Sequence, residues 1–166
     1  MRVLVWGLVS GGLGLLISTL LMSVFFILIG HPPYAFFTLV GHVFKVGVLG
    51  GFIIHVATGL LIGVIFISMI NSVEVLRPST QRKGIILGAI AGLIVYLLLF
   101  LPFALVVAPD AIIEILTRIV EDVPEARIEF LVRNLIIPGF LAGSLLIHMV
   151  YGAVMGLVAS YLWRRA

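Results

Sequence analysis

A 14-residue pattern that occurs twice constrains the fold of this chain more than any other feature. Residues 50–63 and residues 143–156 both follow G-[GS]-x-x-I-H-x-x-x-G-x-x-x-G. Residues spaced by four lie on one face of a helix, so each copy aligns its histidine, His55 or His148, with the two glycines that follow it. The pattern therefore predicts two helices, each with an imidazole above a flat packing surface.

Glycine at every fourth position lets helices approach closely in lipid, where small residues favour helix packing. The same spacing begins a third apolar stretch. We therefore expect helix-packing contacts at Gly59, Gly63, Gly84, Gly88, Gly92, Gly152 and Gly156. We also expect the two histidine-containing helices to lie beside each other, because that arrangement keeps both imidazoles away from lipid.

The composition indicates an integral membrane protein. Hydrophobic residues make up 63% of the 166 residues and charged residues 10%, whereas a soluble domain is about half apolar. A spanning helix needs about 20 residues, so the chain can hold four crossings but hardly six. The absence of cysteine excludes disulfides, thiolate metal sites and thiol catalysis. The basic residues are dispersed, so we expect no nucleic-acid partner.

Four apolar stretches are long enough to cross a bilayer: residues 3–29, 46–70, 84–108 and 138–163. Residues 34–45 predict a short helix or turn at the membrane surface. Pro102 predicts a kink in the third span, Pro109 its end, and Pro138 the beginning of the fourth. The predicted fold is an all-α bundle of four transmembrane helices that forms one domain over residues 1–166.

Residues 111–137 contain most of the acidic residues and predict an amphipathic helical segment. Pro124 divides it in two. The apolar residues of the first piece form a stripe of Ile112, Ile113, Leu116, Ile119, Val120 and Val123, and those of the second Ile128, Leu131, Val132 and Leu135. Glu114, Glu121 and Glu129 fall on the opposite faces. We expect both pieces to lie along the membrane surface or to pack on a partner.

The basic residues predict the orientation. Six basic residues flank the four spans on one side of the membrane: Arg2, Arg77, Arg82, Lys83, Arg164 and Arg165. Because cytoplasmic loops carry the excess of Lys and Arg, both termini are predicted to be cytoplasmic. The expected location is the inner or plasma membrane of the cell.

The chain also contains an internal duplication, with residues 1–70 as repeat 1 and residues 84–163 as repeat 2. A shift of 77 places Gly7, Gly11 and Pro32 on Gly84, Gly88 and Pro109, and a shift of 93 places the first histidine pattern on the second. The difference is an insertion of 16 residues in the second outer connection. Each unit has two spans, so this is a parallel repeat about a pseudo-two-fold axis along the membrane normal.

The two histidines admit two interpretations. Each lies about nine residues, or roughly 14 Å, from the outer end of its helix, close to the middle of a bilayer. In the structural interpretation, each imidazole hydrogen-bonds to a Ser, Thr or carbonyl group of a neighbouring helix. In the other, His55 and His148 are the axial ligands of a b-type haem, and Gly59 and Gly152 leave room for the macrocycle. A zinc or copper site would need a third ligand, and the other two histidines lie near the outer surface.

No pattern in the chain indicates catalysis. The predicted spans hold no carboxylate for acid–base chemistry, and their glycines lack the Lys and Ser/Thr of a phosphate-binding loop. We therefore expect a non-enzymatic subunit or scaffold without a cofactor, which contacts the lipid bilayer and packs on other membrane protein subunits or on copies of itself. A haem-binding electron carrier and a small-solute or ion pathway are the two alternatives.

Overall fold

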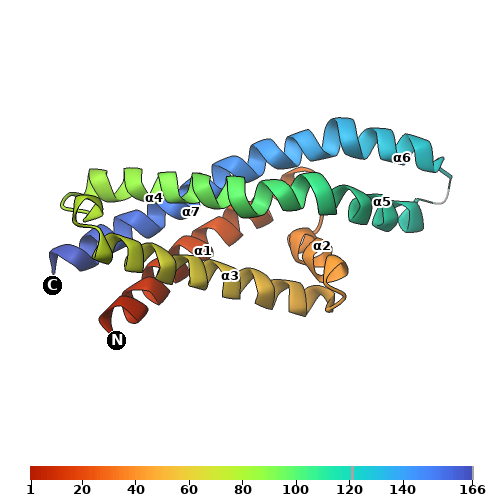
Figure 1. The fold of residues 1–166 in the computed structure, drawn as a ribbon. Coiled ribbons are helices and arrows are strands. Elements are labelled where there is room, and N and C mark those ends of the chain that lie inside the picture. Colours follow the sequence, from red (N-terminus) through yellow and green to blue (C-terminus); the bar gives the residue numbers. More distant parts are fainter. Residues whose placement is uncertain (121, 166) are drawn as a thin grey trace.

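A computed structural model describes residues 1–120 and 122–165 (Figure 1). The chain is 88% helical, and the described residues include no strand. The helical elements up to residue 100 are α1 (Arg2–Leu28), α2 (Ala35–Val43), α3 (Gly47–Ser72), the 3₁₀ turn η1 (Glu74–Leu76), α4 (Gln81–Val95) and the π-helical turn η2 (Tyr96–Phe100). Those after it are the π-helical turn η3 (Phe103–Val107), α5 (Ala108–Ile119), α6 (Glu125–Leu131), the π-helical turn η4 (Val132–Ile136) and α7 (Ile137–Arg164).

Within residues 1–120 and 122–165, four continuous helices are long and apolar enough to cross a membrane. They are α1, α3, the helix Gln81–Ile119 that contains α4 and α5, and the helix Glu125–Arg164 that contains α6 and α7. The predictions of an all-α chain and of four membrane-length helices are therefore confirmed. Residues 35–43 also form the short helix predicted between the first two spans. The two termini and η1 lie at the same end of the bundle (Figure 1).

The order of packing differs from the one predicted. The extensive contacts are those of α4 with α7, α1 with α3, and α1 with α7. The two histidine-containing helices, α3 and α7, therefore do not lie side by side, and that prediction is wrong. The physical reason is that Gly59 and Gly63 face α1, whereas Gly152 and Gly156 face α4.

The two glycine-mediated helix pairs use corresponding positions. A Cβ at Gly63 of α3 would collide with the Gly7 carbonyl oxygen and the Gly11 Cα of α1. A Cβ at Gly156 of α7 would collide with the corresponding atoms of α4, the Gly84 carbonyl oxygen and the Gly88 Cα. Gly92 in turn approaches the His148 carbonyl, Gly152 approaches Gly88, and Gly59 accommodates the side chain of Leu15.

Pro109 does not end the third long helix, and Pro138 does not begin the fourth, contrary to prediction, because both helices continue through them. Each of Pro102, Pro109 and Pro138 follows a five-residue π-helical turn that ends two residues before it. A proline removes one backbone donor and crowds the carbonyl four residues earlier. The wider π turn changes the hydrogen-bonding register at that carbonyl, so the helix continues through the proline.

Glycines with positive φ lie at the break between α1 and α3. Gly30, with φ of +81°, follows the end of α1, and Gly47, with φ of +68°, is the first residue of α3. Lys45, with φ of +56°, also has a positive φ in this segment. The shifts of 77 and 93 place Val107 and Phe140 at the positions of the two glycines. Residues with a Cβ disfavour the left-handed region, which favours a continuous helix at Val107 and Phe140.

The α5–α6 hairpin continues the direction of α4 and α7 beyond the ends of α1 and α3 (Figure 1). The 39-residue helix Gln81–Ile119 is roughly 58 Å long, whereas the hydrocarbon core of a bilayer is about 30 Å thick.

The two arms of the α5–α6 hairpin contact each other. Ala111 of α5 and Ile128 of α6 are buried, and Arg133 bonds to Asp110 at 3.1 Å. Of the two predicted stripes, Ile128 and Val132 are buried but Ile119, Leu131 and Leu135 are exposed. Glu121 lies outside the described residues.

Candidate ligand-binding cavity

A cavity of about 320 Å³ lies inside the bundle and is lined by α1, α2, α3, the α4–η3 segment and α7. Most of its wall is aliphatic or aromatic, and none of the described residues that line it is charged. The polar side chains at the wall are Ser18, His55, Thr58, Ser144, His148 and Tyr151. Both histidines singled out in the sequence therefore line the same cavity.

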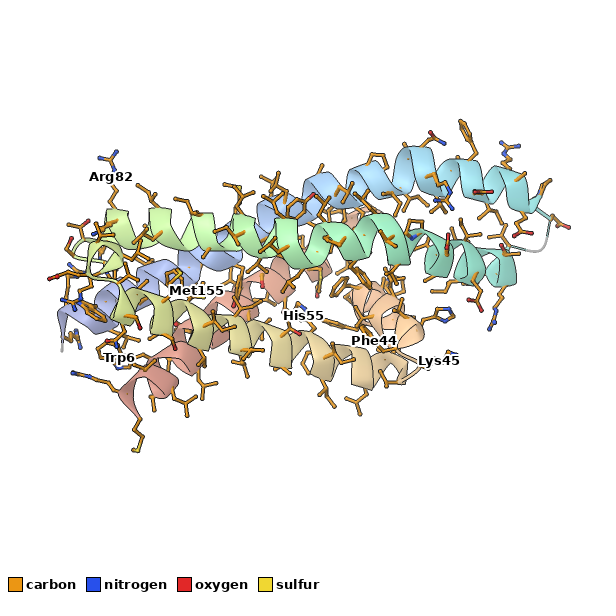
Figure 2. All side chains as sticks on the ribbon, viewed as in Figure 1. Trp6, Phe44, Lys45, His55, Arg82 and Met155 are labelled. Atoms are coloured by element: carbon orange, nitrogen blue, oxygen red, sulfur yellow. The ribbon has the colours of Figure 1, made fainter. Side chains whose placement is uncertain are left out.

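The short helix α2 forms one side of this cavity. Its residues Phe36 and Val40 are buried and contribute to the wall. The ring centroid of Phe36 lies 5.5 Å from that of His55, and the Phe37 centroid lies 5.4 Å from it. Figure 2 shows the His55 side chain directed from α3 toward the interior of the bundle. The break at Gly30 and Gly47 thus lets α2 fold back and cover His55 with aromatic rings.

The cavity opens sideways, between α3 and α4. Phe44, Thr58 and Leu99 line it and are also exposed on the outer surface of the bundle. No extensive contact joins α3 to α4 among the described residues, so no helix closes this side. In a bundle that crosses a membrane, an opening on the side of the helices faces the acyl chains.

His55 is held by a hydrogen bond across a helix interface. Its Nε2 lies 3.2 Å from the Thr19 hydroxyl of α1. Hydroxyls elsewhere in the helices, including those of Thr58 and Ser144, donate to the carbonyl one turn earlier. Thr19 makes no such bond in the structure, so its proton is available for His55 Nε2. With Nε2 as acceptor, the uncharged ring carries its hydrogen on Nδ1.

His148 has the opposite arrangement. Its Nδ1 lies 2.7 Å from the Ser144 carbonyl oxygen, which can only accept, so Nδ1 carries the hydrogen. Nε2 is then a lone-pair acceptor and has no hydrogen-bond partner among the described residues. No side-chain nitrogen or oxygen in that part of the chain is both fully covered and unpaired. The free nitrogen of each histidine is therefore accessible, and the cavity is the open space that both rings line.

A series of aromatic rings connects the two histidines. The Phe36 centroid lies 6.4 Å from that of Phe140, and Phe140 lies 5.1 Å from Phe100. Phe100 lies 5.0 Å from the ring of His148. These rings exclude water from the wall between the imidazoles and offer flat apolar surfaces to a ligand.

Several residues that line the cavity are related by the sequence shifts of 77 and 93. The two shifts align six pairs of lining residues: Ser18 with Val95, Met22 with Leu99, Phe26 with Phe103, Ile54 with Ile147, His55 with His148, and Thr58 with Tyr151. They also place Thr19, the partner of His55, on Tyr96, whose ring centroid lies 5.7 Å from that of His148.

The geometry of the two histidines fits a bis-histidine haem only in part. His148 has the arrangement of a metal-ligating histidine, with Nδ1–H bound to a carbonyl and Nε2 open. His55 differs, because Thr19 occupies its Nε2. Ligation through both Nε2 atoms would break the bond to Thr19. Among the described residues, no group of three or more His, Cys, Asp or Glu could hold a metal ion.

Most of this cavity could not be predicted from the sequence. The repeated pattern indicates the two histidines but not Thr19, Tyr96, Phe36 or Phe140. The only available signal was positional, since Thr19 and Tyr96 are aligned by the shift of 77. Comparisons of the chain with protein-family models, curated proteins and solved structures gave no match.

Proposed function

We propose that this chain is a non-enzymatic membrane protein that binds an apolar, membrane-soluble molecule in the cavity between its two repeats. The observation that carries the proposal is the combination of an apolar interior of about 320 Å³ with a mouth on the lipid-facing side. Ligand pockets are typically concave, mostly apolar and lined by aromatic residues with a few polar groups. The cavity has this composition.

The parallel repeat is part of this proposal. It is supported by the six aligned pairs of lining residues and by the matching glycine contacts of Gly63 and Gly156. A pseudo-two-fold axis through the cavity would relate His55 to His148. We also propose that the end carrying the termini is cytoplasmic, since six basic residues belong to that end. Trp6 and Trp163 support an interfacial position there, because their rings meet at 6.0 Å and such rings favour that depth.

Quenching by brominated lipid tests access to the cavity. Trp6 and Trp163 are first replaced by Phe, and a single tryptophan is introduced by Phe140→Trp in the cavity wall. The delipidated protein is then reconstituted in phosphatidylcholine with brominated acyl chains. Strong quenching is expected, because the cavity opens to the acyl chains. The matched control is Ile67→Trp, at a position that is fully buried away from the cavity. Equally weak quenching at both positions would refute the proposal.

A second candidate function is that of a subunit in a larger membrane complex. Its support is the α5–α6 hairpin, which extends past α1 and α3. The large apolar side chains of Ile119, Phe130 and Leu135 in this region are 64 to 70% exposed. Large apolar side chains exposed outside a membrane favour a protein contact. Native gel electrophoresis tests this function. The double variant Phe130→Ser, Leu135→Ser should reduce the size of the complex. If the wild-type protein and the variant both run as monomers, the subunit function is excluded.

A further inference from the structure

We infer that the molecule bound in the cavity is a lipid alcohol, an apolar molecule whose single polar group is a hydroxyl. The inference rests on the proposed function and adds the chemical class of the ligand. It is drawn from the hydrogen-bonding state of every polar side chain in the wall.

The four hydroxyl groups of the wall have already used their protons. Ser18 donates to the Leu15 carbonyl at 3.0 Å, Thr58 to Ile54 at 2.8 Å, Ser144 to Phe140 at 2.6 Å and Tyr151 to Gly59 at 2.6 Å. The ring nitrogens not engaged by protein are His55 Nδ1 and His148 Nε2. His55 Nδ1 is therefore the remaining side-chain donor of the wall among the described residues, whereas the hydroxyl oxygens and His148 Nε2 can accept.

The two free nitrogens have complementary roles. When the Thr19 hydroxyl donates to His55 Nε2, the ring hydrogen is on Nδ1, which is then a donor. The Ser144 carbonyl can only accept, which makes His148 Nε2 an acceptor. A hydroxyl group is the smallest group that both donates and accepts. A ketone or an ether could use His55 alone, and it would leave the acceptor of His148 unpaired.

The rest of the wall excludes charged headgroups. None of the described residues that line the cavity carries a charge, and its surface is mostly aliphatic and aromatic. Burying an unpaired phosphate or carboxylate in such a site is costly. The lipid-facing mouth at Phe44 and Leu99 admits a molecule that is dissolved in the acyl chains. An uncharged alcohol with a long apolar body satisfies both conditions.

Paired probes test the inference. Binding of geranylgeraniol and of its methyl ether is measured with the full-length protein in detergent. The ether keeps an acceptor oxygen but cannot donate to His148 Nε2. We expect the alcohol to bind about tenfold more tightly, as the loss of one hydrogen bond at a buried acceptor implies. In His148→Phe, affinity for the alcohol should fall to that for the ether, and affinity for the ether should not change.

The control is His31→Phe, which makes the same change at an exposed histidine outside the cavity. It should preserve the tenfold preference. Equal affinity of the wild-type protein for alcohol and ether would overturn the inference and leave the proposed function intact. Failure of the wild-type protein to bind either probe would overturn the inference for this ligand class, while quenching at Phe140→Trp would still test the proposed function separately. The comparison of the two probes in the wild-type protein needs no variant to fold.

Discussion

The Tyr151 hydroxyl of α7 donates a hydrogen bond of 2.6 Å to the Gly59 carbonyl oxygen of α3. These two helices lack extensive packing, so the bond links them directly at the edge of the cavity. Gly14 of α1 makes the position of Tyr151 feasible, because a Cβ at residue 14 would lie 3.1 Å from the tyrosine ring. The hydrogen bond therefore joins the two helices that carry His55 and His148.

Removing this hydroxyl should loosen the cavity. We predict that Tyr151→Phe lowers the free energy of unfolding by about 0.6 to 2 kcal/mol, the range for hydrogen bonds between transmembrane helices. Thermal unfolding in detergent measures the effect. Tyr161→Phe is the control, because Tyr161 is exposed. Equal stability of wild type and Tyr151→Phe would show that the bond does not hold α3 to α7.

Close glycine contacts should make small substitutions costly at the α4–α7 interface. A Cβ at Gly88 would collide with the Gly152 carbonyl oxygen, whereas a Cβ at Gly139 would meet nothing within 4 Å. We predict that Gly88→Ala destabilises the protein by about 1 to 3 kcal/mol through overpacking. Gly139→Ala should be neutral or stabilising by up to about 1 kcal/mol, because alanine favours the helix. Similar melting temperatures for both variants would contradict this packing.

The contact between α2 and α5 should depend on pH. His42 Nε2 lies 3.1 Å from Glu114 Oε2, and this hydrogen bond, with the charge of Arg118, lowers the pKa of Glu114 below its ordinary value of 4.5. A carboxyl group with a lowered pKa stabilises the folded state above the unfolded pKa. That contribution is lost as the pH falls through the folded pKa.

The pH dependence is measured by thermal unfolding of wild type and Glu114→Gln between neutral pH and pH 3. We predict that the wild-type protein is the more stable at neutral pH and that the difference disappears in acid. Glu125→Gln is the control, because Glu125 forms no ion pair among the described residues. A constant difference between wild type and Glu114→Gln at every pH would exclude this explanation.

The helices could be predicted from the sequence because their signals are local. Apolar length located the four spans, and four-residue spacing located the glycine faces. The partner of each face could not be predicted, because periodicity shows which residues share a face and not which helix meets it. The spacing therefore predicts packing faces at Gly63 and Gly156, and the structure has close contacts at both. The predicted pairing of α3 with α7 is wrong.

The prolines and the cavity could not be predicted for different reasons. Pro109 and Pro138 are ordinary signals for the end or the beginning of a helix, and the π turns that let the helices continue have no sequence pattern of their own. The cavity depends on Phe36 and Phe140, which lie far apart in the sequence and meet only because α2 folds back. Sequence reasoning located His55 and His148 but not the space between them.

Native mass spectrometry of the protein released from its own membrane tests the central claim most directly. We predict one bound apolar molecule on the wild-type protein and its loss in Leu99→Trp, which fills the mouth of the cavity. The neighbouring Leu98→Trp should retain it, because Leu98 is 69% exposed and lies outside the cavity wall. A wild-type protein without a bound molecule, or the same bound molecule on all three proteins, would contradict the account.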